Sequence, residues 1–175
     1  MKLINFPLET MDPELLYQHQ GGPATPPVDV WALAEKMGLK VDTSFSFEQL
    51  GYSGEIYWDD EAPTVWINTT ESPVRQRFTL AHEIGHYILH MLPDFDRKTE
   101  FKDKASALRR GGGWDYREMQ ANRFAASLLM PKALIHEEIQ KLNGVPSKSA
   151  LAKTFDVSQE SMGFRLSKLG YTAQP

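Results

Sequence analysis

The sequence predicts an α+β protein in which a small antiparallel sheet packs against a helical core, followed by a pair of short helices. Two strand-like runs lie close together in the first half of the 175-residue chain. Two long helical segments come next, and two short helices with clear start signals close the sequence. Hydrophobic residues make up 41% of the chain and charged residues 24%, an ordinary globular balance that supports a buried core without cross-links.

The N-terminal segment, residues 1–27, is expected to form an arm or linker. Its end, QGGPATPP at residues 20–27, is rich in Gly and Pro, which interrupt regular structure. A short amphipathic helix over residues 30–37 follows, and Gly38 is placed to end it.

The sheet is predicted from three strand-like runs. The first covers residues 39–41, and the other two cover residues 53–58 and 64–68. The segment from Asp59 to Pro63 separates the last two runs, a spacing that is typical of an antiparallel hairpin.

The first long helix should begin at Ser72-Pro73, because Ser caps exposed N–H groups and Pro tolerates the first helical position. It should run to about His90, with Pro93 just beyond it. Residues 93–114 are polar and of mixed charge, and we expect a long loop there with room for one helical turn. Loops of this length inside compact domains are usually functional or disordered.

Further helices are predicted over residues 115–130, where Pro131 ends the helix, and over residues 132–142, where Asn143-Gly144 ends the next one. Together with the preceding strands they define a domain at residues 28–144.

The C-terminal subdomain, residues 145–175, is expected to hold two short helices with helix-turn-helix character, at about 147–155 and 158–169, with Gly170 as the C-cap. A DNA reader would present several cations or amides on the second helix. This helix offers a small set: Gln159, Glu160, Ser161, Arg165 and Lys168. Because phosphate contacts need more basic residues, and the net charge is −4, we favour packing or partner docking over direct DNA binding.

The first long helix carries the motif His82-Glu83-Ile84-Gly85-His86, an HExxH pattern. Residues four apart lie on one face of a helix, so the two imidazoles can point at one metal ion. Glu83 then lies beside the ion, where it can take a proton from an activated water and pass it to a leaving amine. A buried structural histidine pair would not require Glu83 at that position.

A catalytic zinc needs a third protein ligand. His90 is a poor candidate, because the helix rises about 12 Å from His82 to His90, too far for both rings to share one ion. Glu118 is better placed, at the start of the second long helix, with Asn122 one turn later on the same face. Asn122 could orient a ligating His. Spacing alone leaves open that Glu118 is an ordinary acidic residue in a first helical turn.

Two segments resemble the ImmA/IrrE-type metallopeptidases. RFTLAHEIGHY at residues 77–87 is similar to the zinc helix of that family, and EMQANRFAASLLMP at residues 118–131 matches its second signature, ExxANxFAAxLLMP. Weaker similarity extends over residues 28–41 and 150–170. The resemblance implies a zincin-like, gluzincin-type core in which Glu118 is the third ligand and Asn122 the following Asn.

The resemblance also implies a function. Members of this family are typically encoded beside a helix-turn-helix repressor or antitoxin, which they cleave to switch on genes, and many belong to phages, mobile elements or stress responses. Some larger members carry a C-terminal sensor domain, which we do not expect here because the sequence ends at Pro175.

We therefore interpret the chain as a zinc-dependent endopeptidase with Glu83 as general base. The developing oxyanion needs a further donor. Tyr87, Tyr116 and His90 are candidates among which the sequence does not choose. Mn²⁺ or Fe²⁺ could occupy the same ligands. The alternative is a regulator-binding module of the toxin–antitoxin type, braced by zinc without catalysis, or a DNA-binding protein.

The expected location is the cytoplasm. The chain has no cysteine, which excludes disulfides and thiolate zinc sites and suits a reducing compartment. Met1–Met11 lacks a signal-peptide pattern, and no apolar run is long enough to span a membrane.

Overall fold

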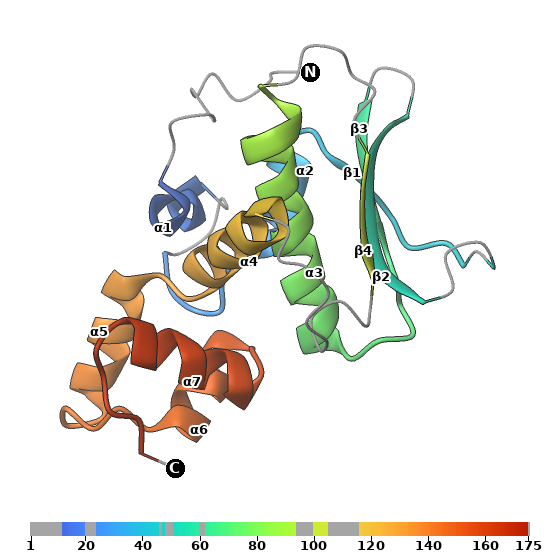
Figure 1. The fold of residues 1–175 in the computed structure, drawn as a ribbon. Coiled ribbons are helices and arrows are strands. Elements are labelled where there is room, and N and C mark those ends of the chain that lie inside the picture. The colour runs from blue at the N-terminus through green and yellow to red at the C-terminus, as the bar shows by residue number, and fades with distance from the viewer. Residues whose placement is uncertain are drawn as a thin grey trace.

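The computed structural model describes residues 12–19, 24–45, 47, 51–59, 62–93, 100–104 and 116–174. Helices and strands alternate in the first part of the chain, and helices alone fill the last part (Figure 1). In chain order the elements are α1 (Pro13–Leu16), the 3₁₀ turn η2 (Tyr17–His19), α2 (Val30–Lys36), β1 (Lys40–Asp42), β2 (Tyr52–Asp59), β3 (Ala62–Ile67), α3 (Pro73–His86), the π-helical turn η4 (Tyr87–Met91), β4 (Phe101–Lys104), α4 (Tyr116–Leu129), α5 (Lys132–Lys141), α6 (Lys148–Phe155) and α7 (Gln159–Lys168).

The sheet has four strands in the order β1-β3-β2-β4. The predicted hairpin is confirmed, because β2 and β3 pair antiparallel from Gly54↔Ile67 to Asp59↔Ala62. The expectation of an antiparallel sheet is wrong for β1, which pairs parallel with β3. The reason is topological: β3 returns antiparallel from β2 and inserts between β1 and β2, which run in opposite directions, so β3 must run parallel to β1.

Strand β4 corrects the expectation that residues 93–114 form a loop without strands. It pairs antiparallel with β2, with Phe101 opposite Ile56, and it occupies the edge of the sheet. The pairing shifts register between Tyr52 and Gly54, a bulge of the kind found near functional sites. The neighbouring parts of the predicted loop, residues 94–99 and 105–114, lie outside the described residues.

The predicted helices are confirmed with small shifts of their ends. Ser158 caps α7 as expected, since its Oγ accepts a hydrogen bond from the Ser161 N–H at 3.0 Å. Ser72 occupies the N-cap position of α3, but its side chain makes no capping hydrogen bond there, so Pro73 at the first helical position is the effective start signal.

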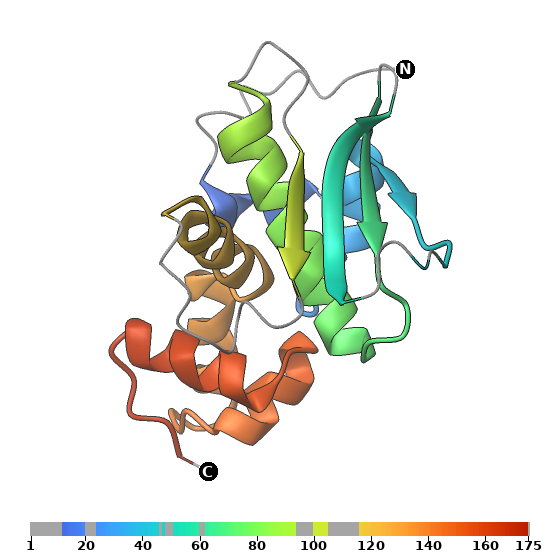
Figure 2. The ribbon, with the colours of Figure 1, turned by 45° about the vertical axis from the view of Figure 1, so that its right-hand side comes forward.

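Helix α3 lies at the centre of the molecule, between the sheet and α4 (Figure 1). Figure 2 shows that α2 and α3 cover the same face of the sheet. The core forms between these layers, and its fully buried side chains include Leu33, Ile56, Ile67, Leu80, Ile84 and Leu128. Because α3 is packed on both sides, its second half is buried throughout, and polar side chains there need specific partners.

The segment predicted as an N-terminal arm contains α1, which packs against α4, and η2; Leu16 of α1 and Tyr17 of η2 are buried in the core. Glu14 joins three parts of the chain. Its Oε1 accepts from the buried Arg165 of α7 at 2.7 Å, and its Oε2 accepts from the Lys132 N–H at the start of α5 at 2.9 Å. This contact ties the first helix to the last one.

A second tie joins α3 to the turn between α6 and α7. The Arg77 guanidinium donates to the carbonyl oxygens of Val28, at 3.0 Å, and Asp156, at 3.2 Å, and lies 3.1 Å from the Asp156 carboxylate. Helices α6 and α7 are present where two short helices were predicted, and their helix-turn-helix character stays a prediction. Among the described residues no helix combines the length and apolarity needed to cross a membrane.

Candidate metal centre

Helices α3 and α4 bring the three predicted ligand side chains to one point. The Nε2 atoms of His82 and His86 lie 3.0 Å apart. The Glu118 carboxylate faces both rings, with Oε2 at 3.2 Å from His82 Nε2 and Oε1 at 3.2 Å from His86 Nε2. Both histidines are 1% exposed, whereas the Glu118 side chain is 34% exposed and forms the solvent side of the cluster.

Close packing between α3 and α4 makes this convergence possible. Gly85 lies in the middle of the HExxH motif, and a Cβ added there would lie 3.1 Å from two atoms of Phe124 and 3.2 Å from the Ala121 Cα. Any side chain at position 85 would therefore push α4 away. Because Ala121 follows Glu118 by less than one helical turn, the close approach at Gly85 also sets how near the Glu118 carboxylate comes to the two rings.

The spacing of the donor atoms fits a tetrahedral metal ion. Ligand atoms at 2.0–2.1 Å from zinc lie about 3.3 Å from each other, close to the separations among these three side chains. The cluster holds three candidate ligands among the described residues, His82, His86 and Glu118, which is the number of protein ligands typical of catalytic zinc sites. Without a metal ion, it is unfavourable to bury the Nε2 atoms of His82 and His86 3.0 Å apart.

The local electrostatics favour the protonation states that metal ligands need. Burial lowers the pKa of His86 to about 4, against the opposing effect of its hydrogen bond with Glu118. Burial would raise the pKa of the Glu118 carboxyl, but the hydrogen bonds with His82 and His86 outweigh it and hold that pKa well below its ordinary value. At neutral pH the His86 imidazole is therefore neutral and the Glu118 carboxylate is ionised, which are the protonation states in which both side chains can bind a cation.

Each histidine is also held at its second ring nitrogen. His82 Nδ1 lies 3.1 Å from Asn122 Oδ1, the contact expected of the predicted orienting residue. His86 Nδ1 lies 3.0 Å from His90 Nδ1, and His90 Nε2 lies 3.1 Å from Gln120 Oε1. His90 thus lies on the side of His86 that faces away from the ligand cluster.

The Glu83 side chain extends from α3 toward β2 and is fully buried. On the strand side it faces Gly54, where an added Cβ would lie 3.2 Å from Glu83 Oε1 and would collide with the Thr79 Cγ2 methyl. The absence of a side chain at position 54 thus gives the Glu83 carboxylate its space. Gly54 and Thr79 were not singled out in the sequence, because nothing in their local pattern shows which strand residue faces the motif.

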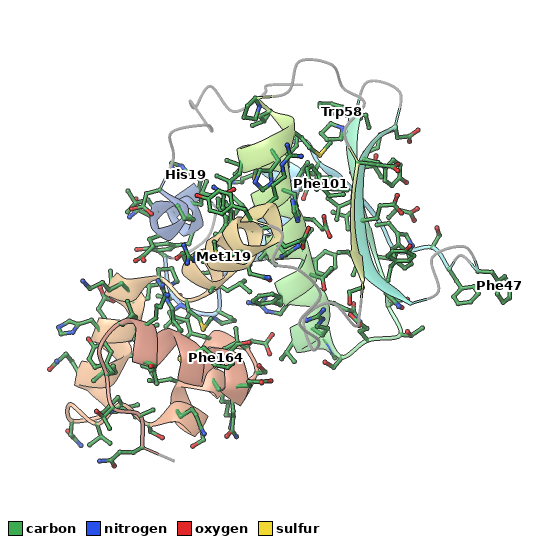
Figure 3. The ribbon with its side chains drawn as sticks, in the orientation of Figure 1. His19, Phe47, Trp58, Phe101, Met119 and Phe164 are labelled. Atoms are coloured by element: carbon green, nitrogen blue, oxygen red, sulfur yellow. The ribbon has the colours of Figure 1, made fainter. Side chains whose placement is uncertain are left out.

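The ring of Phe101 in β4 stacks on the His86 imidazole, with centroids 4.3 Å apart and planes 19° from parallel. Figure 3 shows Phe101 between the sheet and the helices. The sequence did not predict this contact, because Phe101 lies in the segment expected to form a loop. Of the candidate oxyanion donors besides His90, Tyr87 is buried against Trp58 at 6.3 Å between ring centroids, and Tyr116 is 65% exposed at the start of α4. The choice of donor stays open between them.

Comparison with known proteins agrees with the geometry. The model of the IrrE N-terminal-like domain (Peptidase_M78) matches residues 29–167. Over 123 residues the chain is 36% identical to the radiation response metalloprotease IrrE of Deinococcus radiodurans, covering 70% of this chain and 36% of that protein. Over 124 residues it is 30% identical to the metallopeptidase ImmA of Bacillus subtilis, covering 69% of this chain and 67% of that protein.

A solved structure described as a Mycobacterium tuberculosis transcriptional regulator has a similar fold, with a TM-score of 0.57 at 18% identity over 91% of this chain and 46% of that chain. The chain spans about a third of the IrrE relative and two thirds of ImmA. Since the family match covers most of the chain and includes both helices of the metal centre, the protein belongs to the IrrE N-terminal-like family of metallopeptidases.

Proposed function

We propose that this protein is a zinc-dependent endopeptidase that cleaves a partner transcription regulator of the helix-turn-helix repressor or antitoxin class. The convergence of His82, His86 and Glu118, with donor atoms 3.0–3.2 Å apart, carries the proposal. The adjacent, fully buried Glu83 supplies the acid–base group that a structural zinc site would not need.

His82, His86 and Glu118 would hold the zinc ion, which would supply Lewis acidity toward a peptide carbonyl and a water molecule. Glu83 takes a proton from the attacking water and passes it to the departing nitrogen. Its carboxylate lies against Gly54 of β2 in a fully buried position, which supports both transfers from one place. Two imidazoles and one carboxylate also suit Mn²⁺ or Fe²⁺, and zinc is proposed because the donor separations of 3.0–3.2 Å fit a tetrahedral ion, the geometry typical of zinc.

An extended segment of the partner is the expected substrate. Strand β4 lies at the edge of the sheet, and its Phe101 touches the ligand His86, so the sheet edge and the metal centre adjoin. A peptide strand that pairs with this edge would pass the ligand cluster. A folded regulator would have to expose such a segment, which supports a flexible site of cleavage over a site inside a helix.

We propose that α6 and α7 dock a protein partner and do not read DNA. Arg165, one of the few cations predicted for the second helix, is buried and bonded to Glu14 and to the Met130 carbonyl oxygen. The exposed face of α7 carries Phe164, which is 71% exposed and visible in Figure 3. With Arg165 buried, Lys168 is the cation that α7 still exposes beside this apolar ring, a surface that suits a protein better than a phosphate backbone. We also propose a cytoplasmic location, where such regulators act.

The test is cleavage of the regulator encoded by a neighbouring gene. Wild type with zinc should cut it, and a chelator should stop the reaction until zinc is restored. Glu83→Gln should retain zinc but lose at least about 100-fold in rate. Glu137→Gln, at an exposed position on α5, is the matched control and should cut normally. Cleavage by Glu83→Gln at the wild-type rate would exclude this mechanism.

A further inference from the structure

His90 is the least expected neighbour of the metal centre. It lies in η4, the π-helical turn that directly follows His86, and its Nδ1 is 3.0 Å from His86 Nδ1. Its other nitrogen, Nε2, is 3.1 Å from Gln120 Oε1 on α4. Three side chains thus form a line that starts at a metal ligand and ends on the helix that supplies Glu118.

A metal ion bound at His86 Nε2 would fix the hydrogens along this line. His86 turns Nε2 toward His82 and Glu118, so a metal ion would take that lone pair and Nδ1 must carry the proton. His86 Nδ1–H then donates to His90 Nδ1, which must be the acceptor. The proton of His90 therefore sits on Nε2 and is donated to Gln120 Oε1. An amide oxygen accepts and cannot donate, so Gln120 selects the His90 tautomer that His86 needs.

The backbone supports the same arrangement. In an α-helix four residues make slightly more than one turn, whereas in a turn closed by i→i+5 bonds they make slightly less. The Leu92 N–H bonds to the Tyr87 carbonyl at 2.9 Å, an i→i+5 bond that closes this turn. Residue 90 therefore stays on the same side of the helix as residue 86, one turn further along. π-Helical turns are rare and are frequently found at functional sites.

The two ligand histidines are held differently. His82 donates to one amide, Asn122 Oδ1, on α4. His86 reaches α4 through a second imidazole and Gln120, while Phe101 stacks on its ring from the sheet side. The family signature that includes Asn122 therefore accounts for one ligand, and the orientation of the other depends on residues outside that contact.

We infer that His90 and Gln120 are positioning residues that act in series to orient His86 as a metal ligand. This inference rests on the proposed metal centre and not on the identity of the substrate. Removing the acceptor at position 90 should let the His86 ring turn and should weaken metal binding by roughly 10- to 100-fold, the usual effect of residues that orient a ligand.

The experiment measures zinc affinity of the full chain, without substrate, by competition with a chromogenic chelator. His90→Phe keeps an aromatic ring and removes the acceptor; Gln120→Leu removes the second acceptor at similar size. Both should weaken zinc binding, and the double variant should be no weaker than His90→Phe, because Gln120 acts through His90. His90→Gln, which restores an acceptor, should recover part of the loss. His136→Phe, at an exposed histidine on α5, is the control for a His-to-Phe change.

Substitution of cobalt for zinc gives a second reading, because the visible spectrum reports ligand geometry and should change in His90→Phe but not in His136→Phe. Zinc affinity of His90→Phe within twofold of wild type would overturn the inference, and so would additive effects of the two single variants. If His90→Phe does not fold, the zinc affinities of Gln120→Leu and His90→Gln test the inference in its place. A protein that binds zinc as expected but cuts no regulator would contradict the proposed function and leave this inference standing.

Discussion

Gly85 of α3 lies so close to Phe124 of α4 that a methyl group at position 85 would lie 3.1 Å from the Phe124 Cβ and Cδ1 atoms. We predict that Gly85→Ala destabilises the protein by about 1–3 kcal/mol, since overpacking outweighs the gain in helix propensity. Zinc affinity should fall as well, because α4 carries Glu118 with it when it moves. Urea unfolding and chelator competition measure the two effects.

Gly163→Ala is the matched control for that substitution. Gly163 also lies within a helix, but its added Cβ would meet the flexible Lys148 side chain at 3.3 Å. This change should be neutral or stabilise by up to about 1 kcal/mol. Equal stability changes in the two variants would show that the contact between α3 and α4 does not limit position 85.

Loss of a ligand imidazole should remove the metal. We predict that His86→Ala abolishes stoichiometric zinc in the purified protein, because a carboxylate and one imidazole are too few ligands to retain it. Elemental analysis after extensive dialysis checks this outcome. His136→Ala, which changes an exposed histidine, should retain one zinc per chain. Full zinc occupancy in His86→Ala would exclude the proposed ligand set.

Asn122 should matter through His82 alone. Its Oδ1 lies 3.1 Å from His82 Nδ1, so Asn122→Ala should weaken zinc retention or cleavage by roughly 10- to 100-fold. Asn122→Asp keeps an acceptor oxygen and should lose less. Unchanged zinc affinity and rate in Asn122→Ala would remove this residue from the site.

Stability of the zinc-free protein should fall as the pH drops below about 6.5. Burial lowers the folded-state pKa of His86 to about 4, whereas the unfolded chain has the ordinary value of 6.5. Between these values the unfolded state binds more protons, so the free energy of unfolding decreases with falling pH by up to the order of 3 kcal/mol. Urea unfolding across this range measures the slope. His86→Ala should flatten it, and an equally steep slope in that variant would assign the effect elsewhere.

Glu14 should stabilise the fold from its N-terminal end. Glu14→Ala leaves the buried Arg165 guanidinium without its carboxylate at 2.7 Å, and we expect a loss of about 1.5–3 kcal/mol. The midpoint of urea unfolding checks this value. Glu137→Ala removes an exposed carboxylate from α5 and should change little. A similarly small change in Glu14→Ala would mean that Arg165 finds another partner.

Much of the fold follows from local sequence signals. Pro73, Pro131, Ser158 and Gly170 mark helix ends that the structure reproduces to within a residue or two. Strand β4 carries no such signal, because Phe101 is its single apolar residue and the strand exists through pairing with β2. Helix α1 is four residues long, and contacts of Leu16 and Glu14 with distant segments hold it in place. Both elements depend on tertiary contacts that a local pattern does not contain.

Part of the metal centre could be predicted from the sequence, and part of it could not. The spacing of His82 and His86 on one helix predicts that their rings meet, and the structure brings them together with Glu118, whose assignment as a ligand rested on family resemblance. Roles in catalysis stay proposals. The line from His86 through His90 to Gln120 could not be predicted, because the last step joins residues 30 positions apart on different helices. Spacing four residues beyond His86 placed His90 nearby but did not show which ring atom it would meet.

Pairing of β4 with β2 places Phe101 opposite Ile56, and successive residues of a strand point to opposite sides. A slip of this register by one residue would turn the aromatic ring from His86 toward the outer face of the sheet. A slip of two residues would keep the ring on the inward face but carry it about 7 Å along the strand, away from His86. The contact between Phe101 and His86 therefore depends on a single register of the β2–β4 pair.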